Sequence, residues 1–276
     1  MKCYLCGGGR SKTVATAEEI RFGCFASRKA FIQCASCGLI QLSPPWSGRE
    51  LNDLYRDYWK RQDFDGQERK VRVSKYLEDI IGTGDTALEV GCGHGDNVRH
   101  LRKKGLKVIG IDKDPAVCDG KVVVNADVAV VRLKKKPDVI YAIHLIEHLS
   151  DPKWFLRWVS DNLADDGRFA VETPNADDPL RVLYKNKGFQ KFCWYPYHLF
   201  YFTKKTLERL VAETPGIRAT VRVEQEYGIL NHLRWGITGK PGNALPTIPI
   251  LDAIYKFVLT RILGVGDTLV VIGSKA

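Results

Sequence analysis

The chain has 276 residues, of which 45% are hydrophobic and 27% charged, with a formal net charge of +10. This length can bury a full core plus one small accessory module, which excludes a minimal single-motif domain. Charged residues Asp252, Lys256 and Arg261 interrupt the most apolar stretch, so no segment reaches the roughly 20 apolar residues of a spanning helix.

The charge is unevenly distributed along the chain. Residues 1–75 and 181–276 are net basic, whereas residues 76–180 are net acidic. Such asymmetry fits a phosphate-bearing substrate, a nucleic acid or an anionic membrane surface, and equally an ordinary solvated surface. Because no secretory leader opens the sequence, the eight cysteines predict a reducing, cytoplasmic setting where thiols stay reduced or bind metal.

Most of the cysteines lie in the first forty residues. Two CxxC pairs, Cys3 with Cys6 and Cys34 with Cys37, are separated by residues 7–33. Together they offer four thiolates, which predicts a structural Zn²⁺ site in a small module spanning residues 1–45. The alternative, a redox CxxC, requires a helix N-terminus in a βαβ setting that this glycine-rich opening lacks.

A proline turn, SPPWSG, ends this module, and GRELNDLYRDYWKRQ follows with apolar residues at helical spacing. Residues 46–75 are therefore predicted as a linking helix. From residue 76 short apolar runs alternate with helical segments; the runs are TALEVG, KVIGID, KVVVNAD, DVIYAI and RFAVETP. This alternation predicts an α/β fold with a parallel sheet covered by helices.

One run, ALEVGCGHGDN, ends a predicted strand and opens a helix. Its three alternating glycines let the backbone approach a ligand closely. The next strand ends in Asp112, where an acid meets ribose hydroxyls in doubly wound folds, and the third ends near Asp127. Since the loop is acidic and has no lysine, S-adenosylmethionine fits it better than a pyrophosphate does.

Four segments together resemble a known family. LEVGCGHGDN, IGIDKDP, NADV and DVIYAIHLIEHLSDP are similar, in order and spacing, to the successive motifs of class I S-adenosylmethionine-dependent methyltransferases. The similarity covers residues 75–275 and is closest to the branch of ubiquinone-biosynthesis O-methyltransferases and sugar and glycan methyltransferases. It implies a Rossmann-like seven-stranded sheet over residues 76–276, with residues 228–268 inserted into a final antiparallel hairpin.

The resemblance also implies how S-adenosylmethionine is bound. The glycine loop would line its methionine end, with the preceding glutamate tethering the loop. The residue at the end of the second predicted strand would bind the ribose hydroxyls, and the residues at the end of the third strand would contact the adenine. The residues after the fourth strand would border the sulfonium. The cofactor-binding candidates are thus Glu89, Gly91, Gly93, Gly95, Asp112, Lys113, Asp127, Val128, Ile143 and His144.

Methyl transfer is an in-line displacement, so its nucleophile needs a proton acceptor. His144, Glu147 and His148 follow the fourth strand at i, i+3 and i+4, and share one side if helical. The ubiquinone branch has Glu-x-x-Glu-His here, a pattern that can hold a divalent metal. With His144 replacing the first glutamate, three hypotheses stay open: orientation of the helix, a general-base histidine, or a second, softer divalent metal.

An aromatic run, FCWYPYHLFYF at 192–202, resembles the P-x-H-x-x-x-F-T stretch of the same branch. His198 would face the acceptor substrate together with Tyr195, Tyr197 and Tyr201, or these rings pack in the core. QCASCGLIQLSPPWSGRELNDLYRDYW likewise resembles the zinc-binding module before some sugar and glycan methyltransferases. That resemblance makes 46–75 a lid whose Tyr55 and Tyr58 reach the cofactor or acceptor pocket.

The C-terminal part predicts a helix in FTKKTLERLVAE, capped by Thr203, and strands in VRVEQEY and LVVIGSK. The long connection between those strands contains an amphipathic helix. Its apolar residues share one face: Leu251, Ile254, Val258 and Ile262. This face either packs on the domain or a second subunit, or makes a peripheral membrane contact through residues 244–264.

The leading hypothesis is therefore methyl transfer to a hydroxyl, or a sugar carbon, of a small-molecule, glycan or lipid-linked precursor. The first alternative is a ribosomal or transfer RNA base methyltransferase. It is disfavoured because no Asn-Pro-Pro-Tyr-like motif follows the fourth strand and the aromatic residues are not interleaved with arginines. The second, a methyltransferase-like binding subunit without catalysis, is disfavoured by the intact glycine loop and Asp112.

Overall fold

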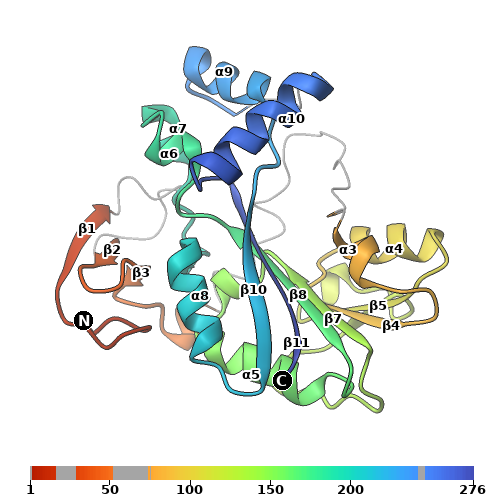
Figure 1. Ribbon diagram of the computed structural model, residues 1–276. Coiled ribbons are helices and arrows are strands. Elements are labelled where there is room, and N and C mark those ends of the chain that lie inside the picture. The colour runs from red at the N-terminus through yellow and green to blue at the C-terminus, as the bar shows by residue number, and fades with distance from the viewer. Residues whose placement is uncertain (1, 17–28, 52–73, 75, 242–245) are drawn as a thin grey trace. The chain divides into compact units, whose positions relative to one another are not determined.

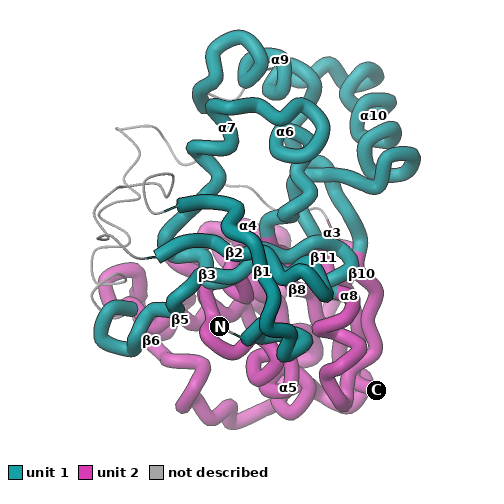
Figure 2. Tube along the Cα trace, turned by 90° about the vertical axis from the view of Figure 1, so that its left-hand side faces the viewer, with its two compact units in different colours: residues 1–67, 174–207, 222–269 teal, residues 68–173, 208–221, 270–276 magenta. Residues whose placement is uncertain are grey.

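The computed structural model describes residues 2–16, 29–51, 74, 76–241 and 246–276 (Figure 1). The chain divides into two compact units, which Figure 2 colours separately. Unit 1 comprises residues 1–67, 174–207 and 222–269, and unit 2 comprises residues 68–173, 208–221 and 270–276. Each unit is therefore assembled from three separate stretches of sequence.

A seven-stranded mixed sheet confirms the predicted α/β class. Its strands follow the order β10-β11-β8-β7-β4-β5-β6. They are β4 (Thr86–Val90), β5 (Lys107–Asp112), β6 (Val123–Asn125), β7 (Val139–Ile143), β8 (Arg168–Pro174), β10 (Ile217–Glu224) and β11 (Thr268–Lys275). Strands β4 to β8 pair in parallel, each where an apolar run was predicted. Chain order reverses between β4 and β7, and ligands of such sheets bind at the carboxyl ends of the strands at this point.

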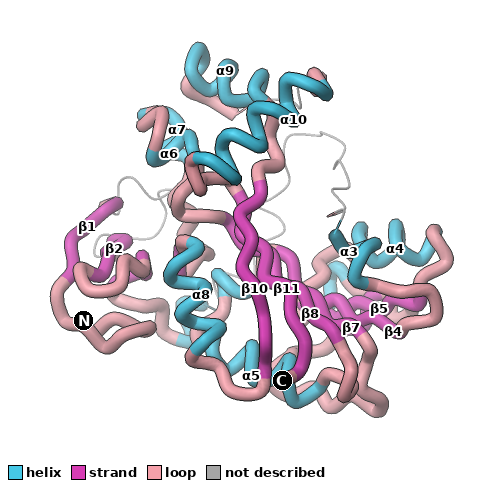
Figure 3. The backbone as a smooth tube through the Cα atoms, viewed as in Figure 1, coloured by secondary structure: helices cyan, strands magenta, loops and turns pink. Residues whose placement is uncertain are grey.

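Helix α3 (Tyr76–Ile80) precedes β4, α4 (Asp96–Lys103) connects β4 to β5, and α5 (Pro152–Asn162) lies between β7 and β8 in the chain (Figure 3). Asp151 starts α5 by accepting a hydrogen bond from the Trp154 backbone N–H at 3.0 Å, and Pro152 follows at the first helical position. Single 3₁₀ turns occupy Pro115–Val117 and Ile146–His148. Helix α8 (Lys204–Ala212) begins at the predicted Thr203 cap, whose Oγ1 accepts from the Thr206 N–H.

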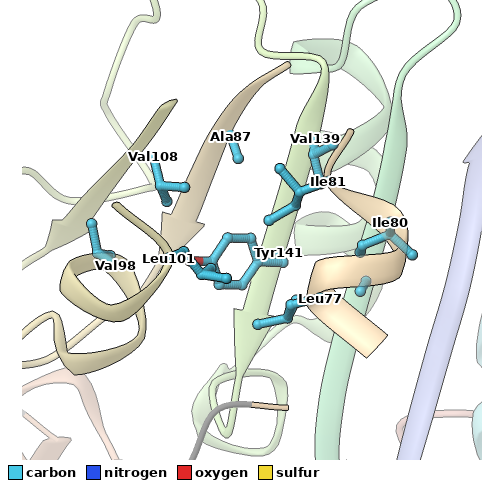
Figure 4. Close-up of a cluster of buried hydrophobic side chains, with 10 residues drawn as sticks. Leu77, Ile80, Ile81, Ala87, Val98, Leu101, Val108, Val139 and Tyr141 are labelled. Atoms are coloured by element: carbon cyan, nitrogen blue, oxygen red, sulfur yellow. The ribbon is translucent and has the colours of Figure 1, made fainter. Parts of the chain in front are cut away.

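One hydrophobic cluster joins the sheet of unit 2 to helices α3 and α4 (Figure 4). Leu77 of α3, Leu101 of α4 and Val139 of β7 are fully buried in it. Burying each such side chain contributes about 1.5–3 kcal/mol. Tyr141 of β7 lies among them, and its hydroxyl donates to Glu89 Oε2 at 3.1 Å, which links the core to the end of β4.

Unit 1 contains a second, four-stranded antiparallel sheet, which confirms the predicted small N-terminal module. Its order is β1 (Ser11–Ala15), β2 (Ala30–Cys34), β3 (Ile40–Ser43) and β9 (Phe200–Tyr201). Strand β9 pairs with β3 through Ile40 opposite Tyr201. This last strand comes from the aromatic run, which sequence analysis did not assign to the module.

Unit 1 contains helices α6 (Pro179–Val182), α7 (Lys187–Phe192), α9 (Ile229–Thr238) and α10 (Pro249–Phe257), the last continued by a π-helical turn, Val258–Ile262. The buried ring of Trp235 in α9 lies 5.3 Å from Phe189 and 5.2 Å from Phe192 of α7, between centroids. Within the described residues, no helix combines the length and the apolar character that a bilayer crossing requires.

Candidate active site

The glycine loop, residues 91–95, leaves β4 and enters α4 with its glycines in the left-handed region. Gly91 has φ +70° and Gly95, the N-cap of α4, has φ +71°. A Cβ on Gly91 would lie 2.7 Å from Leu145 Cδ1, and one on Gly95 would overlap Val123 Cγ2. Glycine is therefore required at both positions for conformation and for space.

Two acidic side chains hold this loop in place. Asp112, at the end of β5, accepts a hydrogen bond from the Gly93 N–H at 2.8 Å through Oδ2, and one from the Asp114 N–H at 2.9 Å through Oδ1. Buried Glu89 accepts from Asn97 Nδ2 at 3.3 Å. Burial raises the pKa of Glu89 to about 8, although the hydrogen bonds from Asn97 and Tyr141 favour the charged form and partly offset this effect.

The end of β6 completes the same edge of the sheet. Asn125 donates from Nδ2 to the Asp112 and Lys113 carbonyl oxygens, at 3.1 and 3.0 Å. Asp127 is exposed, and its Oδ1 accepts from the Ala129 N–H at 2.8 Å, while Val128 is half-buried. Unit 2 thus brings the predicted residues of the first three strands to one edge, where a nucleoside would have carboxylate and amide partners.

His144 follows β7 with φ +51°, an uncommon conformation for a residue other than glycine. Its Nδ1 lies 3.5 Å from Glu147 Oε1 and its Nε2 lies 3.6 Å from Glu172 Oε1. The imidazole is 42% exposed, while both glutamate side chains are at most 2% exposed. An accessible histidine therefore lies between two buried carboxylates at the carboxyl edge of the sheet.

The three predicted catalytic residues of this segment lie close together, although they do not share one helix. Glu147 and His148 belong to a 3₁₀ turn, Ile146–His148, whereas His144 precedes it with a left-handed backbone. Glu147 Oε2 accepts from Thr173 Oγ1 at 2.9 Å, and His148 Nε2 lies 4.0 Å from Glu147 Oε1. The short distance between His144 and Glu147 therefore comes from the bend of the chain at His144 and not from helical spacing.

Sequence analysis missed Glu172, the second carboxylate beside His144. Its Oε2 accepts from Ser74 Oγ at 2.5 Å and from the Tyr76 hydroxyl at 2.9 Å, and Glu172 is 1% exposed. The register of β7 and β8 places it opposite Ile143. The available signal was an acid in RFAVETP, at the end of an otherwise apolar strand.

Comparison with known proteins decides the family. A family model described as a methyltransferase domain matches residues 60–214, more than half of the chain. The chain belongs to the class I S-adenosylmethionine-dependent methyltransferases. Their fold accounts for the order of the seven strands and for the glycine loop at the switch point.

Individual relatives of this chain are distant. Pavine N-methyltransferase of Thalictrum flavum subsp. glaucum is 26% identical over 175 residues, which cover 58% of this chain and 46% of that protein. The chain thus spans about half the length of the curated relative it matches.

Solved structures show the same fold. A SAM-dependent methyltransferase from Archaeoglobus fulgidus gives a TM-score of 0.52 at 20% identity, covering 81% of this chain and 99% of that one. The 1,6-didemethyltoxoflavin-N1-methyltransferase of Burkholderia thailandensis gives 0.52 at 15%, covering 91% and 97%.

The residues predicted to contact the acceptor belong to two parts of the chain. Tyr55 and Tyr58 lie outside the described residues. In unit 1, Tyr197 and Tyr201 are buried, and the Tyr201 hydroxyl donates to the Cys193 carbonyl at 2.8 Å. His198 is half-buried, with its ring centroid 5.1 Å from that of Tyr195. Tyr201 therefore serves packing, while His198 and Tyr195 keep exposed surface.

Four cysteines of unit 1 form one cluster. Cys3 Sγ lies 3.5 Å from Cys37 Sγ, Cys6 Sγ lies 3.5 Å from Cys34 Sγ, and all four Sγ atoms lie within 4.8 Å of one another. Tetrahedral Zn²⁺ with bonds of about 2.3 Å places its sulfur ligands about 3.8 Å apart. Burial raises the pKa of Cys34, but backbone N–H groups of Cys37 and Ser36 lower it to about 6.

Replacing Gly95 with alanine is expected to lower the free energy of unfolding by about 2–4 kcal/mol. Alanine would have to adopt a left-handed backbone, and its Cβ would in addition overlap Val123. Gly105→Ala is the matched control. Gly105 has φ +85° but open space around it, so only the conformational part, about 1–2 kcal/mol, is expected. Urea titration measures both, and equal losses would contradict the overlap.

Proposed function

We propose that this protein transfers the methyl group of S-adenosylmethionine to a hydroxyl, or a sugar carbon, of a small-molecule, glycan or lipid-linked acceptor. The observation that carries the proposal is His144, held between two buried carboxylates, with the next residue, Leu145, close to Gly91 of the glycine loop. A hydroxyl nucleophile must lose a proton, and an accessible imidazole is suited to take it.

The residues at the carboxyl edge fit S-adenosylmethionine chemically. When bound, the cofactor supplies an electrophilic methyl group on a sulfonium. The loop offers no lysine for a phosphate. It lies beside two acidic side chains: Glu89, whose charged form an incoming ammonium group would favour, and Asp112, which suits ribose hydroxyls. Gly91, Gly93 and Gly95 would hold the methionine end, Asp112 and Lys113 the ribose, Asp127 and Val128 the adenine, and Ile143 and His144 the sulfonium side.

His144 acts as the general base in this proposal. A proton taken by either ring nitrogen leaves an imidazolium between Glu147 and Glu172, whose negative charges favour it. Hydrogen bonds from Thr173, Ser74 and Tyr76 fix the two carboxylates, so the ring does not have to reorganise its surroundings when it gains charge.

An amine is the second candidate acceptor. The names of two relatives, pavine N-methyltransferase and 1,6-didemethyltoxoflavin-N1-methyltransferase, specify methylation at nitrogen. A protonated amine would be attracted by the acids at this edge, and His144 would remove its proton in the same way. The base therefore has the same role for both acceptors.

The four-cysteine cluster is proposed to hold a structural Zn²⁺, since its spacing and thiol ligands fit that ion. We keep the prediction that residues 46–75 form a linking lid. A contact of Tyr195 and His198 with the acceptor is likewise a prediction. A second metal at His144, Glu147 and His148 is the weaker alternative to the general base.

Two measurements test the proposed function. Isothermal titration with S-adenosylmethionine is expected to show one site, and no heat of binding would contradict the cofactor assignment. Incubation with the tritiated cofactor and a cell extract, followed by separation into RNA, lipid and small-molecule fractions, is expected to label the last two. Label in RNA alone would favour the RNA-methyltransferase alternative and contradict the proposed acceptor.

A further inference from the structure

We propose that α9, α10 and the π-helical turn of unit 1 form a docking surface for an anionic lipid bilayer, with α10 lying in the plane of the interface. We call this surface the apolar face. Its residues are large, apolar and exposed: Leu233, Ile237, Ile248, Ile250, Leu251, Ile254, Phe257, Ile262 and Leu263.

Helix α10 is oriented with its polar side inward. Asp252 is only 6% exposed, and its carboxylate accepts from the Ile229 N–H at 2.9 Å and from the Ile248 N–H at 2.9 Å. One buried side chain thus caps the starts of both α9 and α10. The contact is close enough that a Cβ on Gly228 would overlap Asp252, so glycine is needed there.

The next turns of α10 repeat this orientation. Tyr255 contacts the buried His232 of α9 and hydrogen-bonds the Tyr184 hydroxyl at 2.8 Å. Lys256 donates from Nζ to the Glu226 carbonyl at 2.6 Å, and Leu259 is buried. Four inward contacts at helical spacing fix the rotation of the helix, so its apolar side is held outward.

The side chains on that outward side are large and apolar, yet most of their surface is exposed. Ile250 is 79% exposed, Phe257 59% and Ile262 65%, and Ile237 of the neighbouring α9 reaches 85%. Ile254, predicted for the apolar side of the helix, is 57% exposed, so this side does not pack on the described part of unit 1. Exposed apolar groups gathered in this way mark an interaction surface.

The positive charge around the apolar face favours an anionic partner. In residues 179–203 and 227–266 the only carboxylate side chain is Asp252, which is buried. The exposed basic residues there are Lys185, Lys187, Lys191, Lys240 and Arg261. A second copy of the chain would bring the same positive charge against this surface, whereas anionic headgroups complement it.

The length of the element agrees with an in-plane arrangement. Helix α10 and the π-helical turn together span residues 249–262, too few to cross a bilayer. A helix with an apolar side, a polar side and basic flanks lies instead at the boundary of headgroups and acyl chains. This inference concerns binding alone and does not depend on methyl transfer.

Vesicle sedimentation tests the proposal with the full chain. Wild-type protein is expected to bind vesicles of phosphatidylglycerol and phosphatidylcholine at least tenfold more tightly than vesicles of phosphatidylcholine alone, and less tightly as salt increases. The double variant Ile250→Glu with Ile254→Glu is expected to lose binding at least tenfold. Val130→Glu, at a position 77% exposed in unit 2, is the matched control and is expected to bind like wild type.

Circular dichroism and the urea midpoint of each variant confirm that the fold is retained, which is expected because the side chains replaced are exposed. Wild type that stays in the supernatant with both vesicle types would overturn the proposal, as would equal binding by the double variant. Sedimentation velocity could give a third result against the proposal. If wild type is a dimer, the double variant is a monomer and neither binds vesicles, a second copy of the chain covers this face.

Discussion

Replacing His144 with asparagine is expected to lower kcat by about 10²–10⁴-fold, the usual contribution of a general base. Asparagine is chosen because it tolerates the left-handed backbone that His144 adopts, so the loop after β7 keeps its shape. The affinity for S-adenosylmethionine is expected to change little. The residual activity should also lose the acidic limb of the pH profile, since the group that must be deprotonated is gone.

Steady-state kinetics with an acceptor found in the labelling experiment, from pH 5 to 9, measure this effect. His100→Asn is the matched control, because His100 is a half-buried histidine of α4, with its side chain 38% exposed, that takes no part in the proposed chemistry. A His144→Asn enzyme with a normal kcat and an unchanged pH profile would contradict the role as base. In that case His144 would serve only to orient the turn that follows it.

Replacing Cys34 with serine is expected to abolish zinc binding and to unfold the N-terminal sheet. Zinc contributes about 10–16 kcal/mol of apparent binding free energy in small four-ligand modules, and Cys34, the last residue of β2, is one of the four clustered cysteines. Wild type is expected to contain one zinc per chain by elemental analysis. The variant should contain none and should show a low-temperature transition or rapid proteolysis before residue 46.

Cys193→Ser is the control for this second prediction, because Cys193 lies at the end of α7 and outside the cluster. It is expected to keep one zinc per chain. A strong chelator added to wild type should reproduce the Cys34→Ser behaviour. Metal-free wild type with an unchanged melting curve would contradict a structural zinc site.

The fold was predictable where its signals are local. Apolar runs gave the strands of the main sheet, and Asp151 with Pro152 marked the start of α5. The rotation of α10 was not predictable, because periodicity defines two sides of a helix without saying which side faces inward. Its inner contacts come from Ile229, His232 and Glu226, whose positions depend on the fold of the whole segment.

The candidate site, like the fold, was predictable only where its residues are close in sequence. His144, Glu147 and His148 are close in sequence, so their proximity was predictable, although His144 lies before the 3₁₀ turn and not on a shared helix. Glu172 reaches His144 only through the pairing of β7 with β8, and Ser74 reaches Glu172 from a distant part of the chain. Such contacts depend on strand register, which an isolated sequence does not specify.

Strand β9 has a consequence for how the protein is made. The N-terminal sheet obtains its fourth strand from Phe200 and Tyr201, so residues 44–199 must be synthesised before that sheet can close. At ribosomal speeds of about 5–20 residues per second, the unpaired edge of β3 waits on the order of ten seconds. Early binding of a metal ion by the four cysteines would hold the nascent module together through this interval.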